Sequence, residues 1–98
     1  MATYVLMTTL SPEVTKNMRN RAEIGRQWKQ RVENQVPGIK WLAHYALLGP
    51  FDFLDIYEAP DEEAAAKVSM ISLSMGALRA ESWTAIPYSR LLELAAEI

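Results

Sequence analysis

Gly49-Pro50 stands between two strand-like segments near the middle of the 98-residue chain, and this turn constrains the fold more than any other feature. Residues 39–48 are rich in aromatic and aliphatic side chains, and residues 51–58 alternate before they stop at Pro60. Glycine and proline together favour a turn, and a turn flanked by such runs is typical of a β-hairpin. We therefore expect two antiparallel strands here.

A strand and a long helix are expected before the hairpin. Residues 3–9 are β-branched and aromatic, which favours a strand. Ser11 and Pro12 then supply an N-cap hydroxyl and a proline at the first helical position, so we expect a helix from there to about Gln35. At helical spacing one stripe of this helix would pack inward. The stripe consists of Val14, Met18, Gly25, Trp28 and Val32.

Arg21 falls inside the same stripe, and two interpretations of it stay open. Its aliphatic stem can pack against apolar neighbours while the guanidinium reaches water, as long cationic side chains often do. Alternatively, the guanidinium reaches a buried anion or a partner chain.

A second helix, a fourth strand and a short terminal helix are expected after the hairpin. Asp61 opens an acidic first turn and Gly76 ends the helix, after which residues 78–86 favour a strand. A short apolar helix follows Pro87. The order βαββαβ is the split βαβ, or ferredoxin-like, arrangement. We expect one α+β domain over residues 1–98, with a four-stranded antiparallel sheet and helices on one face.

Alternation along the hairpin sorts its side chains onto two faces, because successive strand residues point to opposite sides. Depending on the turn, His44 faces Asp55 or Tyr57, and all three share one face in both registers. The expected core face holds Trp41, Ala43, Tyr45, Leu47, Leu54 and Ile56, and Val5 and Met7 suit the same side. The mixed face holds Lys40, Leu42, His44, Ala46, Phe53, Asp55 and Tyr57, together with Arg79, Glu81 and Trp83.

The mixed face is the expected functional surface, because a two-layer fold leaves one sheet face without helices. Phe53, Tyr57 and Trp83 exposed together would form an apolar patch larger than monomers usually tolerate. We therefore expect a second subunit to cover this face or a cavity to form there.

The segment Gly49-Pro50-Phe51-Asp52 resembles the motif of the GYD-domain family, with Phe51 in place of the tyrosine. Residues 58–67, 79–81 and 1–5 are also similar to that family. The resemblance implies a ferredoxin-like domain of the dimeric α/β-barrel type, in which two sheets face each other. The family has no settled biochemical activity, so the resemblance implies a fold and almost no function. Asp52 is expected to cap backbone amides near the turn, with ligand binding as the alternative.

Two functions of different classes fit these residues. The first is a small-molecule pocket in which His44 pairs with Asp55 or Tyr57 for acid–base chemistry, and this includes a cofactor-free monooxygenase or isomerase. Further side chains of the mixed face would bind the ligand, namely Arg79, Glu81, Trp83, Phe53 and Lys40. Alternatively, Lys40, Arg79, Asp55 and Glu81 form cross-strand ion pairs in a structural surface and His44 is an interface residue. The second is a non-catalytic assembly, accessory or sensor module.

Composition narrows these classes further. The chain has no cysteine and one histidine, which argues against thiolate chemistry and metal sites, and no phosphate-binding glycine loop is present. A net charge of −2 argues against nucleic acid and anionic membranes as partners. No targeting or membrane-spanning pattern occurs. We expect a cytoplasmic homodimer or larger homo-oligomer that needs no cofactor.

Overall fold

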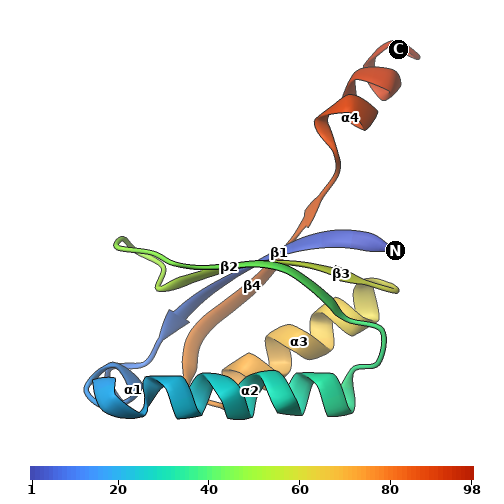
Figure 1. Cartoon of the computed structure of the whole chain (residues 1–98). Coiled ribbons are helices and arrows are strands. Elements are labelled where there is room, and N and C mark those ends of the chain that lie inside the picture. The colour runs from blue at the N-terminus through green and yellow to red at the C-terminus, as the bar shows by residue number, and fades with distance from the viewer.

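The computed structural model describes residues 1–98 except the side chain of Met18, so the predicted place of Met18 on the apolar stripe lies outside the described residues. Strands and helices follow in the predicted order (Figure 1). The elements are β1 (Ala2–Leu10), α1 (Pro12–Thr15), the 3₁₀-helix η1 (Met18–Asn20), α2 (Arg21–Gln35), β2 (Lys40–Ala46), β3 (Phe53–Ala59), α3 (Glu62–Ser74), β4 (Ala77–Ala85) and α4 (Tyr88–Ala95).

The four strands form one sheet in the order β2-β3-β1-β4, and every neighbouring pair is antiparallel. The helices α2 and α3 lie on the same side of this sheet (Figure 1). A split βαβ unit gives this strand order, because each helix carries the chain across one intervening strand. The predicted α+β, ferredoxin-like architecture is confirmed.

The prediction of one continuous helix from Pro12 to about Gln35 is wrong in its first turns. The side chain of Ser11 caps α1 as expected, but α1 ends at Thr15. The N–H of Asn17 then bonds to the Val14 carbonyl, and the N–H of Asn20 bonds to the Asn17 carbonyl. These i→i+3 bonds make tighter 3₁₀ turns, so the regular helix restarts at Arg21.

The hydrophobic core lies between the sheet and the helices. Its buried members come from β1, β3, α2 and α3 and from the residues just beyond α2. They are Tyr4, Leu6, Val32, Val36, Tyr57, Ala59, Ala64, Ala65, Val68 and Ile71. Each large apolar side chain in this set contributes about 1.5–3 kcal/mol by leaving water. Because Tyr4, Leu6, Tyr57 and Ala59 belong to this core, the even positions of β1 and the odd positions of β3 face the helices.

His44 and Asp55 lie on the face that the helices cover, so the prediction that they lie on the uncovered face is wrong. Directly paired residues of an antiparallel sheet point to the same side. Asp55 pairs with His44 on one side and with Leu6 on the other, and Leu6 is fully buried in the core. Of the two registers left open by the sequence, the one that pairs His44 with Asp55 is confirmed.

A bulge in β2 moves Trp41 to the helix side as well. Trp41 pairs with Tyr57 and Ala43 pairs with Ile56, so Leu42 is one residue without an opposite partner. An extra residue in one strand reverses the facing of everything before it. The predicted grouping of Trp41 with Ala43 is therefore wrong.

The opposite side of the sheet, called here the open face, carries only part of the predicted mixed set, because Ala46, Phe53 and Tyr57 lie with His44 and Asp55 on the covered face. Val5 pairs with Trp83 and with Ile56, and Met7 pairs with Glu81 and with Leu54. The expected core role of Val5 and Met7 beneath the helices is thus corrected. The open face comprises Val5, Met7, Thr9, Lys40, Ala43, Tyr45, Leu54, Ile56, Arg79, Glu81 and Trp83. Lys40, Arg79, Glu81 and Trp83 therefore share no face with His44 and Asp55.

The terminal helix α4 extends away from the body on the side of the sheet opposite α2 and α3 (Figure 1). All of its residues are exposed, including Tyr88, Leu91 and Leu92. A helix of eight residues has little stability of its own in water. In the described part of the chain α4 packs against no other element, and its apolar side chains stay exposed.

Gly76 is expected to tolerate no side chain. Its φ of 105° lies in the left-handed region, and a Cβ there would approach Cγ2 of Val14 to 2.6 Å. We predict that Gly76→Ala lowers the free energy of unfolding by about 1–3 kcal/mol, measured by urea denaturation. Gly25→Ala is the matched control, because a Cβ at this α2 position meets nothing within 4 Å and alanine raises helix propensity. Equal stability of Gly76→Ala and the wild type would contradict this account.

Candidate functional site

A pocket of about 680 Å³ lies between α2 and the covered face of the sheet. Its walls are mainly apolar and come from α2, β2, β3 and the segments around α1 and α3. The largest apolar lining residues are Leu10, Ile24, Trp28, Trp41, Phe53 and Met75. Small-molecule sites are usually clefts of about 300–1,000 Å³ with apolar walls and a few polar groups, and this pocket fits that description.

His44 and Asp55 line the pocket and are hydrogen-bonded through Nδ1 and Oδ1. The Asp55 side chain is 5% exposed and the His44 side chain is 61% exposed, so the carboxylate is buried behind the imidazole. An ionised carboxylate can only accept hydrogen bonds, so the Nδ1–H of His44 donates to it. This bond fixes the ring tautomer and leaves Nε2 for a ligand or for proton transfer.

The burial of Asp55 has an electrostatic consequence. Burial raises the pKa of Asp55 above its ordinary value, while the charge and the hydrogen bond of His44 oppose that rise. A carboxyl group with this environment holds its proton more tightly in the folded chain than in the unfolded one. Such a perturbed group beside a histidine in a cleft is a reasonable centre for binding or proton transfer.

Phe53 brings α2 and β2 together at one side of the pocket. The His44 ring stacks on it with the centroids 5.3 Å apart, and the Arg21 guanidinium carbon lies 5.1 Å from the same centroid. Cations over aromatic rings are attracted to the negative ring face. Arg21 is partly buried and lines the pocket, so its charged group lies at the pocket and not on the outer surface of α2.

Two tryptophans form another part of the pocket wall. The rings of Trp28 and Trp41 lie 5.1 Å apart, and Trp41 lies 5.4 Å from the Tyr57 ring beneath it. The Nε1–H of Trp28 donates to Ser72 Oγ at 2.8 Å. Among the described residues, Trp41 Nε1 is buried and has no acceptor.

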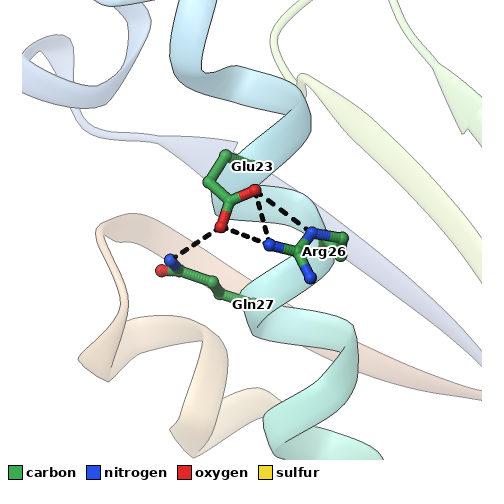
Figure 2. Close-up of polar contacts among 3 residues, drawn as sticks. All are labelled: Glu23, Arg26 and Gln27. Atoms are coloured by element: carbon green, nitrogen blue, oxygen red, sulfur yellow. Dashed lines mark hydrogen bonds and ion pairs between the residues drawn. The ribbon is translucent and has the colours of Figure 1, made fainter.

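Arg26 also lines the pocket, but its charge is engaged by its own helix. Figure 2 shows the carboxylate of Glu23 between Arg26 and Gln27. Arg26 donates to Glu23 through Nε at 3.1 Å and through one terminal nitrogen, and Gln27 donates from Nε2 at 3.1 Å. The hydrogen bond from Arg26 lowers the pKa of Glu23. The pair is therefore a local helix contact beside the pocket.

Tyr57, expected beside His44, lies in the core instead of lining the pocket. Its hydroxyl shares a 2.9 Å hydrogen bond with Ser82, and its ring stacks on Tyr4. Burial raises the pKa of Tyr57 above its ordinary value, and the Ser82 bond opposes that rise. The group stays neutral at physiological pH, and the structure gives it no contact with the pocket space.

The predicted ligand-binding residues of β4 form a separate cluster on the open face. Arg79 and Trp83 both donate to Glu81, at 2.8 and 3.0 Å. The structure thus brings Phe53 together with His44 and Asp55. It places Lys40, Arg79, Glu81 and Trp83 on the other side of the sheet.

Neither a metal cluster nor a membrane-spanning helix is found in the described part of the chain. No three His, Cys, Asp or Glu residues with described side chains are grouped so that they could hold a metal ion. Within the same residues, no helix has the length and apolar character to cross a bilayer.

A family model described as the GYD domain matches residues 4–95. This chain belongs to the GYD-domain family. A protein from Thermus thermophilus, named glutamine synthetase and cystathionine beta-lyase binding protein, is 28% identical to the GYD chain over 92 residues. The match covers 94% of this chain and 96% of the Thermus protein. No solved structure matches the chain.

In this GYD chain the aspartate of the motif has a structural position. Asp52 Oδ2 accepts from the N–H of Leu10 at 2.7 Å, and the Asp52 N–H donates to the Thr8 carbonyl at 2.8 Å. The amide that it caps belongs to the end of β1, at an irregularity in the pairing of β1 with β4, and not to the turn itself. This supports the structural interpretation of Asp52. Phe51 contacts Trp83 edge-on and lies beneath Arg79, so it extends the open-face cluster.

Sequence reasoning missed the walls that α2 and β2 give to the pocket of the GYD chain. The signal that could have revealed the α2 wall is helical spacing, which places Trp28 and Gly25 on the inward stripe of the helix. A glycine on an inward stripe leaves space that no side chain fills, and here a Cβ at Gly25 would meet no atom within 4 Å. Trp41 carried no such signal, because the bulge at Leu42 that turns it inward breaks the alternation.

The His44–Asp55 pair makes a prediction about pH. Because burial raises the Asp55 pKa, the folded chain loses stability as pH rises from near the ordinary value of 3.8 through the raised pKa. His44→Ala removes the opposing partner, so we expect a steeper fall and a loss of about 1–3 kcal/mol at pH 7, measured by urea denaturation.

Asp55→Asn is the control for that measurement. Its amide oxygen can still accept from His44 but cannot ionise, so this pH-dependent loss should disappear. The same pH dependence in His44→Ala and in the wild type would contradict the pairing of the two side chains.

Proposed function

We propose that this chain is a small-molecule-binding module whose ligand lies in the pocket between α2 and the sheet. The observation that carries the proposal is the exposed His44 ring hydrogen-bonded to the buried Asp55 carboxylate at the wall of a mainly apolar space of about 680 Å³. Apolar walls supply affinity, and a few oriented polar groups supply specificity. The site differs from the one expected from sequence, which lay on the other face of the sheet.

The pair also suits proton transfer to or from a bound molecule. Asp55 orients the His44 ring through Nδ1, so Nε2 can take up or release a proton. This arrangement supports binding first and a cofactor-free reaction second, because the apolar walls favour binding and the His44–Asp55 pair offers one site of proton transfer.

Filling the pocket from α2 tests the proposal. Gly25→Leu places a side chain into the pocket from a position where even the Cβ has open space, so we expect it to fold and to abolish ligand binding. The measurement is a thermal-shift screen of small aromatic and aliphatic compounds, in which a bound ligand raises the melting temperature. Gly49→Leu, at a second glycine with open space but outside the lining residues, is the control.

Hits that shift the wild type and the Gly49→Leu variant but not Gly25→Leu would support the pocket. Compounds that shift Gly25→Leu as strongly as the wild type would contradict it. A screen that yields no ligand for the wild type would contradict it as well.

We further propose that the open face is covered by a second copy of the chain. Tyr45 is 60% exposed and Trp83 is 47% exposed there, beside Val5, Leu54 and Ile56. An apolar surface of this kind is usually an interface. A two-fold dimer brings the same surface of both chains together, so one apolar face is sufficient to build it.

Sedimentation of a charged variant tests the dimer. Trp83→Glu puts a carboxylate on the open face, and we expect it to convert a dimer into a monomer at micromolar concentration, because an unpaired charge is costly to bury. Met70→Glu is the matched control, since Met70 is also exposed but lies on the outer side of α3. A wild type that sediments as a monomer, or a Trp83→Glu variant that stays dimeric, would refute the interface.

An accessory module that binds enzymes is the second candidate function. It is favoured by the similarity to the Thermus protein, whose name states that it binds glutamine synthetase and cystathionine beta-lyase. The exposed apolar residues of α4 offer a surface for such a partner. Binding of the two purified enzymes that is lost in Leu91→Glu and kept in Gly25→Leu would favour this candidate over the pocket.

A further inference from the structure

We propose that the ligand of the pocket is an aromatic molecule with a weakly acidic hydroxyl group, such as a substituted phenol, whose O–H donates to Nε2 of His44. The inference rests on the proposed pocket function and adds the chemical class of the ligand. It follows from the proton that Asp55 holds on the His44 ring, from the acceptors that the lining offers and from the aromatic rings in the pocket wall.

The His44 ring presents a hydrogen-bond acceptor to the pocket. Its Nδ1–H donates to the buried Asp55 carboxylate, so Nε2 is the ring nitrogen left for a ligand. In a neutral imidazole one nitrogen carries the proton and the other accepts. A carboxylate at Nδ1 keeps the proton on that nitrogen, which leaves Nε2 bare. While the ring is neutral, a ligand that meets Nε2 must therefore supply the donor.

The position of this acceptor is fixed from two sides. Asp55 holds one edge of the His44 ring, and the Phe53 ring lies against one face of it, with the centroids 5.3 Å apart and the planes inclined by 22°. Phe53 pairs with Ala46 in one neighbouring strand and with Thr8 in the other, so the pocket-lining side chains on either side of it are small. The ring is thus ordered before a ligand binds, which favours affinity, and space remains beside it.

The other side-chain acceptors of the described lining are engaged or buried. The Asp55 side chain is 5% exposed and accepts from His44. Ser72 Oγ accepts from the Trp28 indole at 2.8 Å and donates to a backbone carbonyl of α3, and Thr8 is buried. The arginines and the lysine of the lining donate hydrogen bonds and accept none. His44, with 61% of its side chain exposed, is therefore the acceptor that a ligand hydroxyl reaches most readily.

Aromatic rings from three elements favour an aromatic body for the ligand. Trp28 of α2, Trp41 of β2 and Phe53 of β3 all line the pocket. Contacts between rings contribute beyond the apolar area that they bury, and an aliphatic chain in the same space would lack that contribution. A hydroxyl on an aromatic ring is also a weak acid, which makes it a good donor to an imidazole. A phenol therefore matches both the wall and the acceptor.

A matched pair of probes tests the inference. We would measure binding of 4-propylphenol and of its methyl ether, 4-propylanisole, by calorimetry at pH 8. The ether keeps the ring and the oxygen but has no O–H to donate. One neutral hydrogen bond changes affinity by about fivefold, so we expect the phenol to bind about fivefold or more tightly than the ether.

Two variants test whether His44 is the partner of the hydroxyl. Asp55→Asn can face Nδ1 with its amide oxygen or with its NH₂ group, so the proton is no longer held on Nδ1. We expect its preference for the phenol to fall while its affinity for the ether stays unchanged. His44→Phe keeps a ring beside Phe53 without an acceptor and should lose the preference entirely. Arg26→Gln is the matched control at the lining, because Arg26 is already paired with Glu23 (Figure 2).

The imidazole itself gives a readout that needs no variant. His44 is the one histidine of the chain, so a ¹⁵N spectrum contains a single pair of imidazole nitrogen signals, and their couplings to the ring C–H protons distinguish Nδ1 from Nε2. At pH 8 we expect a protonated Nδ1 and a bare Nε2. Addition of the phenol, but not of the ether, should move the Nε2 signal toward the protonated position. A protonated Nε2 in the free protein at pH 8 would overturn the inference.

The outcomes separate this inference from the proposed function. Equal affinity for phenol and ether, with both blocked by Gly25→Leu, would overturn the hydroxyl-bearing class and leave the pocket function standing. A phenol preference that survives in Asp55→Asn and in a folded His44→Phe, verified by circular dichroism, would overturn the role of His44 and the inference with it. If neither probe binds but the screen finds ligands that Gly25→Leu blocks, the inference fails and the pocket function remains.

Discussion

A column of four aromatic rings joins α2 to three strands of the sheet and sets the spacing of the helix layer. Trp28 of α2 lies on Trp41 of β2, Trp41 lies on Tyr57 of β3, and Tyr57 stacks on Tyr4 of β1, with centroid distances of 5.1 to 5.6 Å. Rings of this size contribute much of the buried apolar area, and they also act as spacers. They hold one part of α2 at a distance from the sheet, and the pocket lies in the space beside them.

The buried carboxylate of Asp55 explains why the faces of the sheet were predicted the wrong way round. The strand-like segments and the turn at Gly49-Pro50 were sufficient to predict the fold and the pairing of His44 with Asp55 as one of two registers. From sequence alone, an aspartate among aromatic residues favours the uncovered face, because a charged group is costly to bury. The hydrogen bond from His44 makes the opposite placement tolerable, because a buried charge is acceptable when it is paired.

The α2 wall of the site could be predicted only in part. Helical spacing placed Trp28 and Gly25 on the inner stripe, but it could not show that α2 stands away from the sheet. The bulge at Leu42, which turns Trp41 inward, depends on pairing with β3 and has no signature in β2 alone. Long-range contacts decide both features, and single-sequence periodicity does not carry them.

We therefore assign different roles to the two sides of the sheet. The helix-covered side holds a pocket with a paired acid and base, and the open face and α4 carry exposed apolar side chains that we propose as surfaces for other chains. The Thermus relative is named for binding two enzymes, and binding of this kind is compatible with a ligand pocket. A bound small molecule can stabilise one form of a surface that binds a partner. In this account ligand and partner use opposite sides of one sheet.

The indole N–H signals of the three tryptophans in a ¹H–¹⁵N spectrum distinguish a ligand in the pocket from one on the open face. Trp41 and Trp28 line the pocket and Trp83 lies on the open face, and Trp→Phe variants assign each signal. On addition of a ligand, we expect the Trp28 and Trp41 signals to shift, because both indole rings line the pocket and a bound molecule changes their surroundings, with the Trp83 signal unchanged. A shift confined to Trp83 would contradict this expectation.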